Sequence, residues 1–135
     1  MIITCFIGVS FASCNLAKTD KSTNLGEHTS QNSLDWKGTY YGVTPCASCP
    51  GIETELTLMS DQDFILTQSY IDSEETDTVK GKFNWEGNKI KLEGNNKGDA
   101  SWIYKIEEGK VRQLDLQGNE VTGELAQYYI LIKKR

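Results

Sequence analysis

Residues 52–58 read Ile-Glu-Thr-Glu-Leu-Thr-Leu, and apolar or small side chains alternate there with charged or polar ones. Successive side chains of an extended strand point to opposite faces, so the isoleucine and both leucines share one face and both glutamates the other. A strand with one buried and one solvated face is typical of an antiparallel sheet. The segment therefore predicts an antiparallel strand over a hydrophobic core.

The same period of two continues through the rest of the chain from Trp36, and no convincing amphipathic helix interrupts it. Residues with turn chemistry occupy 60–63, 86–88, 107–109 and 117–119. The expected strands lie near 37–44, 52–59, 63–71, 78–85, 88–93, 100–107, 110–116 and 126–133.

This order of strands predicts an all-β fold. About eight strands joined by short hairpins suit a small up-and-down antiparallel β-barrel, because closure removes both sheet edges. A two-sheet sandwich would have much the same pattern. We expect Phe83, Trp85, Trp102 and Tyr104 to fill the core or line the barrel.

Composition narrows the function. The chain has 135 residues, 38% of them hydrophobic, which suits one domain. Its formal net charge of −5 disfavours nucleic acid as a partner. The single histidine, His28, lies in a polar stretch, so the expected folded body has no Ser-His-Asp set. Phosphate-binding glycine loops and HExxH are also absent. We do not expect an enzyme.

The N-terminus reads as an export and anchoring signal. Residues 1–13 are apolar and end in small residues, as signal peptides do, and Phe11-Ala12-Ser13-Cys14 resembles the lipobox of bacterial lipoproteins. We expect 1–13 to be removed, Cys14 to be acylated and held in a membrane, 14–35 to form a flexible tether, and 36–135 to form the barrel. The alternative is a buried strand at 1–13 and an ordinary thiol at Cys14.

A pair of thiols, Cys46 and Cys49, stands between Pro45 and Pro50 just before the alternating segment. A disulfide here would contribute only about 2 kcal/mol, because it closes a short loop. Thioredoxin-like catalysis would need a helix after the motif, and a strand follows instead. Zinc usually takes four Cys or His ligands, whereas Cu(I) accepts two thiolates. A structural disulfide, a redox switch and a Cu(I) site all stay open.

The segment from Tyr40 to Leu58 contains Gly-Val-Thr-Pro-Cys-Ala-Ser-Cys-Pro-Gly-Ile-Glu-Thr-Glu-Leu. It resembles the pattern G-x-x-P-C-A-x-C-x-G-I-x-T-x-L of the N-terminal domain of the copper resistance lipoprotein NlpE family. Residues 114–120 and 123–126 are similar to the family's final hairpin. The resemblance implies an eight-stranded, lipocalin-like β-barrel on an outer-membrane lipoprotein that faces the periplasm, with Cys46 and Cys49 as the CxxC pair and Cys14 as the acylated residue.

The resemblance also implies a role in copper tolerance or the envelope stress response, through Cu(I) binding or thiol/disulfide sensing and a stress-signalling partner. The chain stops at Arg135, so we expect it to lack the second, OB-like domain of the long family members, and signalling that needs that domain is in doubt. An alternative function is a carrier of a small apolar ligand, with a structural CxxC disulfide. A purely structural or docking role is a third.

Overall fold

The computed structural model describes residue 31 and residues 34–94 and 102–135. The predicted signal peptide 1–13, the acylated Cys14 and nearly all of the predicted tether, including His28, lie outside the described residues.

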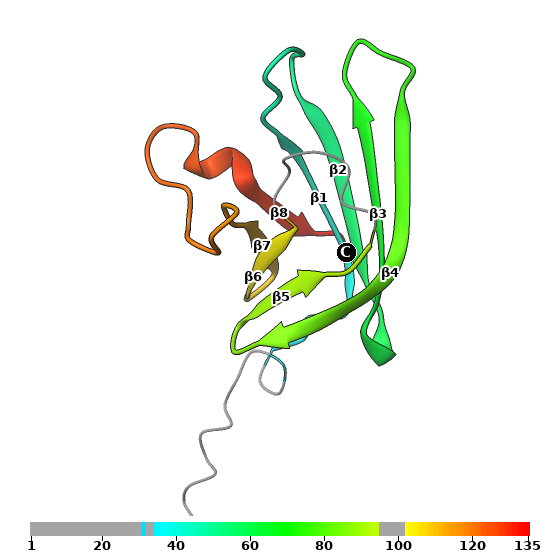
Figure 1. Ribbon diagram of the computed structural model, residues 1–135, viewed down its shortest axis with the longest axis vertical. Coiled ribbons are helices and arrows are strands. Elements are labelled where there is room, and N and C mark those ends of the chain that lie inside the picture. The colour runs from blue at the N-terminus through cyan, green and yellow to red at the C-terminus, as the bar shows by residue number, and fades with distance from the viewer. Residues whose placement is uncertain (1–30, 32–33, 95–101) are drawn as a thin grey trace, which may run out of the picture.

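Eight antiparallel strands form a closed barrel in chain order (Figure 1). The predicted up-and-down barrel is therefore confirmed, and the two-sheet sandwich is excluded. The strands are β1 (Gly38–Thr44), β2 (Ile52–Leu58), β3 (Asp63–Tyr70), β4 (Thr76–Glu86), β5 (Lys89–Leu92), β6 (Ile103–Glu107), β7 (Lys110–Gln113) and β8 (Ile130–Lys133).

Closure of the barrel depends on β1, which pairs with β2 on one side and β8 on the other. The first pairing runs along the whole of β1, from Gly38 opposite Leu58 to Thr44 opposite Ile52. The second is short and sets Tyr40 opposite Lys133 and Tyr41 opposite Ile132. Neither β1 nor β8 is left as an open edge, as the predicted closed up-and-down barrel requires.

Strand β4 is longer than predicted because it serves two neighbours. It pairs with β3 as far as Lys82 and with β5 from Phe83 onward. Gly81 lies at the change of partner, where a Cβ atom would come within 2.5 Å of the Glu93 carbonyl oxygen and 3.1 Å of the Phe64 ring. A glycine here lets the two chain segments approach closely and lets the strand bend around the barrel corner.

The last predicted strand, 126–133, is wrong in its first half. Residues Ala126–Tyr129 form the 3-10 helix η3, and β8 begins only at Ile130. Gly123, with φ of 94°, turns the chain, and the amides of Ala126 and Tyr128 donate to the carbonyls of Gly123 and Leu125. These local bonds replace the ladder bonds that a longer strand would make.

Strand β7 likewise ends before the predicted residue 116. The Asp115 carboxylate accepts hydrogen bonds from the amides of Gln117 and Asn119 and turns the chain away from the sheet. Leu114, which directly follows β7, forms an isolated bridge with Glu120.

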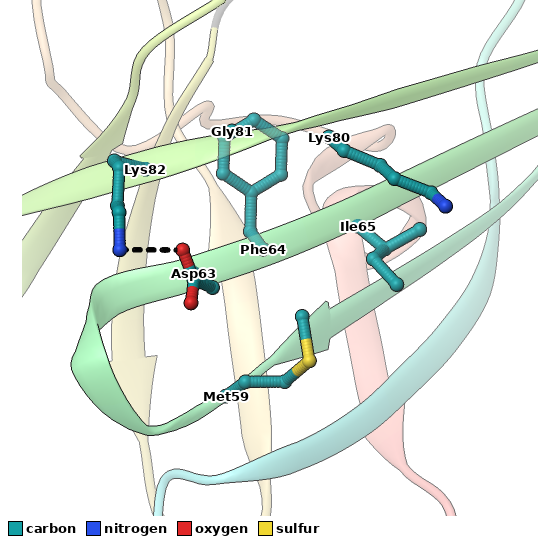
Figure 2. Close-up of a pocket in the computed structure, with 7 residues that line it drawn as sticks. All are labelled: Met59, Asp63, Phe64, Ile65, Lys80, Gly81 and Lys82. Atoms are coloured by element: carbon teal, nitrogen blue, oxygen red, sulfur yellow. Dashed lines mark ion pairs between the residues drawn. The ribbon is translucent and has the colours of Figure 1, made fainter.

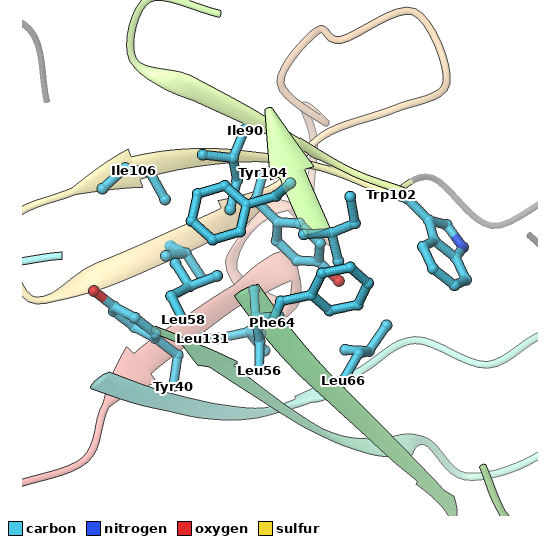
Figure 3. Close-up of a cluster of buried hydrophobic side chains, with 13 residues drawn as sticks. Tyr40, Leu56, Leu58, Phe64, Leu66, Ile90, Trp102, Tyr104, Ile106 and Leu131 are labelled. Carbon is cyan, nitrogen blue, oxygen red and sulfur yellow. The ribbon is translucent and has the colours of Figure 1, made fainter. Parts of the chain in front are cut away.

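The barrel interior is filled with apolar side chains (Figure 3). Phe83 and Tyr104 are fully buried and Trp102 is 8% exposed, as the alternation predicted, while Trp85 is partly buried and packs against the same cluster. The buried cluster consists of Tyr40, Leu56, Leu58, Phe64, Leu66, Phe83, Ile90, Leu92, Trp102, Tyr104, Ile106, Val111 and Leu131.

Candidate functional site

The two ends of the barrel differ in construction. One end, the closed end, receives the chain at Trp36 and carries the short turns that follow β2, β4 and β6. The other, the loop end, carries the longer connections 45–51, 71–75 and 114–129. Figure 1 shows the β1–β2 and β3–β4 connections side by side at the top of the view. Both predicted site cysteines lie at the loop end.

Cys46 and Cys49 are joined by a disulfide, with a Cα–Cα distance of 5.3 Å. The flanking prolines, Pro45 and Pro50, have fixed φ angles and no amide donor, so neither residue can extend the sheet into the loop. The Thr44–Ile52 pair closes the loop at the barrel rim. The disulfide confirms that the two thiols meet.

The Gly51 carbonyl oxygen ties the cysteine loop to its neighbour. It accepts a hydrogen bond of 3.0 Å from the amide of Ile71, in the β3–β4 connection. Cys49 Sγ lies 3.3 Å from the same oxygen. A disulfide sulfur has no proton to donate, so this second approach is a contact and becomes a possible hydrogen bond only when the cysteine is a thiol.

Two buried hydroxyl groups lie beneath the cysteine loop. Thr44 and Thr54 face each other across β1 and β2, with their Oγ1 atoms 3.0 Å apart, and are 5% and 0% exposed. Thr54 Oγ1 also donates to the Ile52 carbonyl at 3.2 Å. Each hydroxyl therefore has a partner, as buried polar groups require, and the pair forms a small polar layer above the apolar core.

An apolar groove of about 370 Å³ runs beside the disulfide. Its walls are the end of β1, the cysteine loop and the segment around η3, and none of its lining residues is charged. Three of its apolar side chains are strongly exposed, with Val43 at 39%, Leu125 at 53% and Tyr128 at 50%. The groove is lined by Val43, Thr44, Pro45, Cys46, Pro50, Leu125 and Tyr128.

The sequence reasoning missed Leu125 and Tyr128 as groove residues. Residues 126–133 were expected to form a strand, and nothing in the local pattern indicated that η3 packs near β1. Only closure of the barrel, which sets β8 beside β1, brings this distant segment to the cysteine loop.

Candidate metal ligands near the pair are few. Within the described residues, no three side chains of His, Cys, Asp or Glu gather closely enough to hold a metal ion. Met59, the nearest soft donor in sequence, follows β2 and so lies at the closed end, about 20 Å away by strand length. The cysteines themselves are the donor set that the described site offers.

A second depression, of about 360 Å³, lies on the outer surface of β3 and β4 next to Met59 (Figure 2). The Lys82–Asp63 ion pair, at 2.7 Å, bounds it on one side, and Ile65 and Lys80 also line it. Both charged partners are well exposed, which is typical of a solvated surface. We assign it no role.

Among the residues that the structure describes, there is no helix with the length and apolar character needed to cross a membrane.

Comparisons with known proteins agree on one relationship. The profile of the NlpE N-terminal domain matches residues 40–124. Lipoprotein NlpE of Escherichia coli K12 is 32% identical over 85 residues, which are 62% of this chain and 36% of that protein. The chain thus spans about a third of the length of this curated relative.

Two solved structures are also similar. A presumed lipoprotein from Shewanella oneidensis, in a crystal structure at 1.42 Å resolution, is 47% identical with a TM-score of 0.71, and the match covers 79% of this chain and 96% of that one. The crystal structure of the Cpx pathway activator NlpE from Escherichia coli is 26% identical with a TM-score of 0.53, covering 64% of this chain and 46% of that one.

Proposed function

The chain belongs to the NlpE N-terminal domain family, and from that premise we propose that it is an envelope lipoprotein whose Cys46–Cys49 pair switches between a disulfide and a dithiol that captures Cu(I). It serves copper tolerance or the envelope stress response and acts on a stress-signalling protein of the envelope. The observation that carries the proposal is the disulfide on an exposed loop of a chain homologous to an envelope lipoprotein.

The chemistry of the pair suits Cu(I). Cu(I) prefers soft thiolate ligands and tolerates low coordination numbers, so two cysteines suffice without a histidine or carboxylate. The two Cα atoms are only 5.3 Å apart, so both side chains can reach one ion after reduction. Cu(I) binding requires the dithiol, so oxidation of the pair to the disulfide abolishes copper capture. The copper response therefore depends on the redox state of the two cysteines.

The cysteine loop lies at the end of the barrel opposite the point where the chain enters it. Asp35 and Trp36 join the barrel at the closed end, where Lys133 Nζ lies 3.0 Å from the Asp35 carboxylate. An acyl group on Cys14 would hold the chain upstream of this point in the outer membrane. The cysteine loop lies at the opposite end of β1, about 20 Å away from this point.

A carrier of an apolar ligand is less well supported. The thirteen residues of the buried cluster extend across the interior, and Tyr40, Phe83 and Leu131 are each 0% exposed. Among the residues that the structure describes, these side chains occupy the interior space that a drug-sized or lipid ligand would need.

The test is a Cu(I) titration of the reduced protein against a competing chelator. We expect one Cu(I) per chain, and no tight binding in the Cys46→Ser/Cys49→Ser double variant. Met59→Leu is the matched control, since it removes a soft donor at the closed end and should leave the affinity unchanged. Absence of binding in the unaltered protein, or full binding in the double variant, would refute the copper role.

A cellular experiment tests the sensing role separately. Cells that express the double variant should lose the copper tolerance, or the copper-induced stress response, that the unaltered chain supports. The variant must be present at the same level in the envelope. An unchanged response in those cells would remove the pair from signalling.

A further inference from the structure

The two sulfur-bearing residues of the disulfide have different surroundings. Cys46 is one of the residues that line the apolar groove, together with Val43, Leu125 and Tyr128, whereas Cys49 is not among them. Cys49 Sγ instead contacts the Gly51 carbonyl oxygen at 3.3 Å. A molecule seated in the groove therefore meets Cys46 first.

The surroundings of Cys49 suit the thiol that forms when the disulfide opens at Cys46. When the disulfide opens at Cys46, the electron pair of the S–S bond passes to Cys49, which takes a proton from solvent. The resulting thiol can donate to the Gly51 carbonyl, which already lies within reach. Attack at Cys49 would instead require the thiol to reach a residue that does not line the groove.

We propose that Cys46 is the sulfur at which an exported protein dithiol exchanges with this disulfide, with the uncharged, apolar segment around the attacking cysteine seated in the groove. The inference rests on the redox switching of the proposed function and adds the site of attack and the class of partner. The partner needs a thiol because Cys46, a disulfide-bonded cysteine, lines the groove. The partner segment should be apolar because none of the groove's lining residues is charged.

Each step of the exchange is balanced. The partner's first thiolate attacks Cys46 Sγ, a mixed disulfide forms, and the Cys46–Cys49 bond breaks. The partner's second thiolate then attacks its own sulfur in the mixed disulfide and releases Cys46 as a thiolate, which is protonated. The pair gains two electrons and two protons, and the partner dithiol becomes a disulfide.

Because the proposed function places the chain in the cell envelope, the occupant is a protein of the periplasm. The chain enters the barrel at the closed end, so the groove lies at the end opposite the entry point. Concave sites lined mainly by uncharged, apolar side chains are typical places for a ligand or partner segment to bind. Here one wall of the groove includes a cysteine of the disulfide.

The site of attack can be mapped directly on the full mature chain. The probe is a short synthetic peptide with one cysteine flanked by phenylalanine and leucine. After brief exposure, acid quenching and alkylation, mass spectrometry shows which cysteine carries the peptide. We expect the peptide on Cys46 and the alkyl group on Cys49, by about tenfold or more. Equal labelling, or peptide on Cys49, would overturn the proposal.

The groove is tested through the rate of exchange. Leu125→Ser and Tyr128→Ser should each slow exchange with the apolar peptide by about fivefold, because each removes a contact surface. Exchange with free cysteine should be unchanged in both variants. Leu116→Ser is the matched control, since Leu116 is 57% exposed and does not line the groove.

Equal slowing with both thiols, or slowing in the Leu116→Ser control, would mean that the groove does not seat the probe and would overturn the docking step. Unfolding midpoints of all variants are compared beforehand to ensure that each is folded. Neither readout involves copper. A chain that binds Cu(I) but exchanges equally at both sulfurs would retain the proposed function and lose this inference.

Discussion

The closed end and the loop end of this barrel are stabilised by different forces. At the closed end, the Trp36 ring lies edge-on against Phe83 and Trp85, with centroid distances of 5.8 and 5.5 Å, and Tyr40 donates a hydrogen bond of 2.7 Å to the Trp36 carbonyl. At the loop end, a disulfide and hydrogen bonds hold the cysteine loop. Burial of aromatic side chains at the closed end contributes most to the stability of the barrel. The cysteine loop, which a disulfide and hydrogen bonds hold, can change its redox state while the barrel stays folded.

The largest effect is expected from Phe83→Ala. Phe83 is fully buried between the core and Trp36, so its truncation should lower the free energy of unfolding by about 3–5 kcal/mol. Urea denaturation followed by circular dichroism measures this change. Tyr128→Ala, an exposed aromatic at the loop end, serves as the control and should shift stability by less than about 0.5 kcal/mol. Similar losses in both variants would contradict the contrast between the ends.

Removal of the disulfide should have the next largest effect. The Cys46→Ser/Cys49→Ser variant should lose about 2 kcal/mol or less, because the crosslink closes only a short loop of the unfolded chain. The same denaturation experiment, run on the oxidised protein and the double variant, gives the value. Loss of folding in the double variant would show that the loop end stabilises the barrel and would contradict the dominant role of the closed end.

Sequence reasoning succeeded where the structure depends on local alternation. The period of two placed Leu56 and Leu58 inside and Glu53 outside, and the structure confirms this because barrel closure buries one face of every strand. It also placed Cys46 and Cys49 in one loop, since their spacing alone keeps them close. The oxidation state of the pair was left open, because spacing does not distinguish a thiol from a disulfide.

Contacts between distant segments were beyond that reasoning. The groove needs Leu125 and Tyr128 beside the cysteine loop, and this follows from the pairing of β8 with β1, not from any local pattern. The closing of the barrel end by Trp36 was likewise unforeseen, because Trp36 precedes the first strand. Local hydrogen bonds around η3 also overrode the expected strand there.

Tyr40→Phe sharpens the comparison at the closed end. The variant loses the hydrogen bond to Trp36 and should be about 1 kcal/mol less stable at pH 7. Burial, with Asp35 and Glu108 adding to it, raises the pKa of Tyr40 from 10.0 to about 12. A raised folded pKa means that the unfolded chain ionises first, so this stabilisation is present below pH 10 and is lost as the pH rises toward 12.

Denaturation curves at several pH values test this expectation. The stability difference between the unaltered protein and Tyr40→Phe should shrink, and then reverse in sign, as the pH rises above 10. A difference that stays constant over this interval would mean that the hydroxyl group is not held in a buried, neutral form.

The smallest effect is expected at an ion-pair network that links the two ends. Arg112 Nε lies 2.9 Å from the Glu107 carboxylate, at the end of β6, and 3.1 Å from that of Glu120, in the segment that leads to the groove. Partial burial tends to raise the pKa of Glu107, but the hydrogen bond and charge of Arg112 outweigh it, so the pKa lies below the usual 4.5.

A lowered folded pKa gives stability that is present above the unfolded pKa and is lost as the pH falls through the folded pKa. Glu107→Gln should therefore reduce stability by less than about 1 kcal/mol at pH 7, and this deficit should disappear under acid conditions. Thermal unfolding at both pH values measures the change. Because Arg112 keeps its contact with Glu120, the exchange rate at Cys46 should be unaffected. A slower exchange in this variant would show that the two ends are energetically coupled and that the loop end does not switch independently of the barrel.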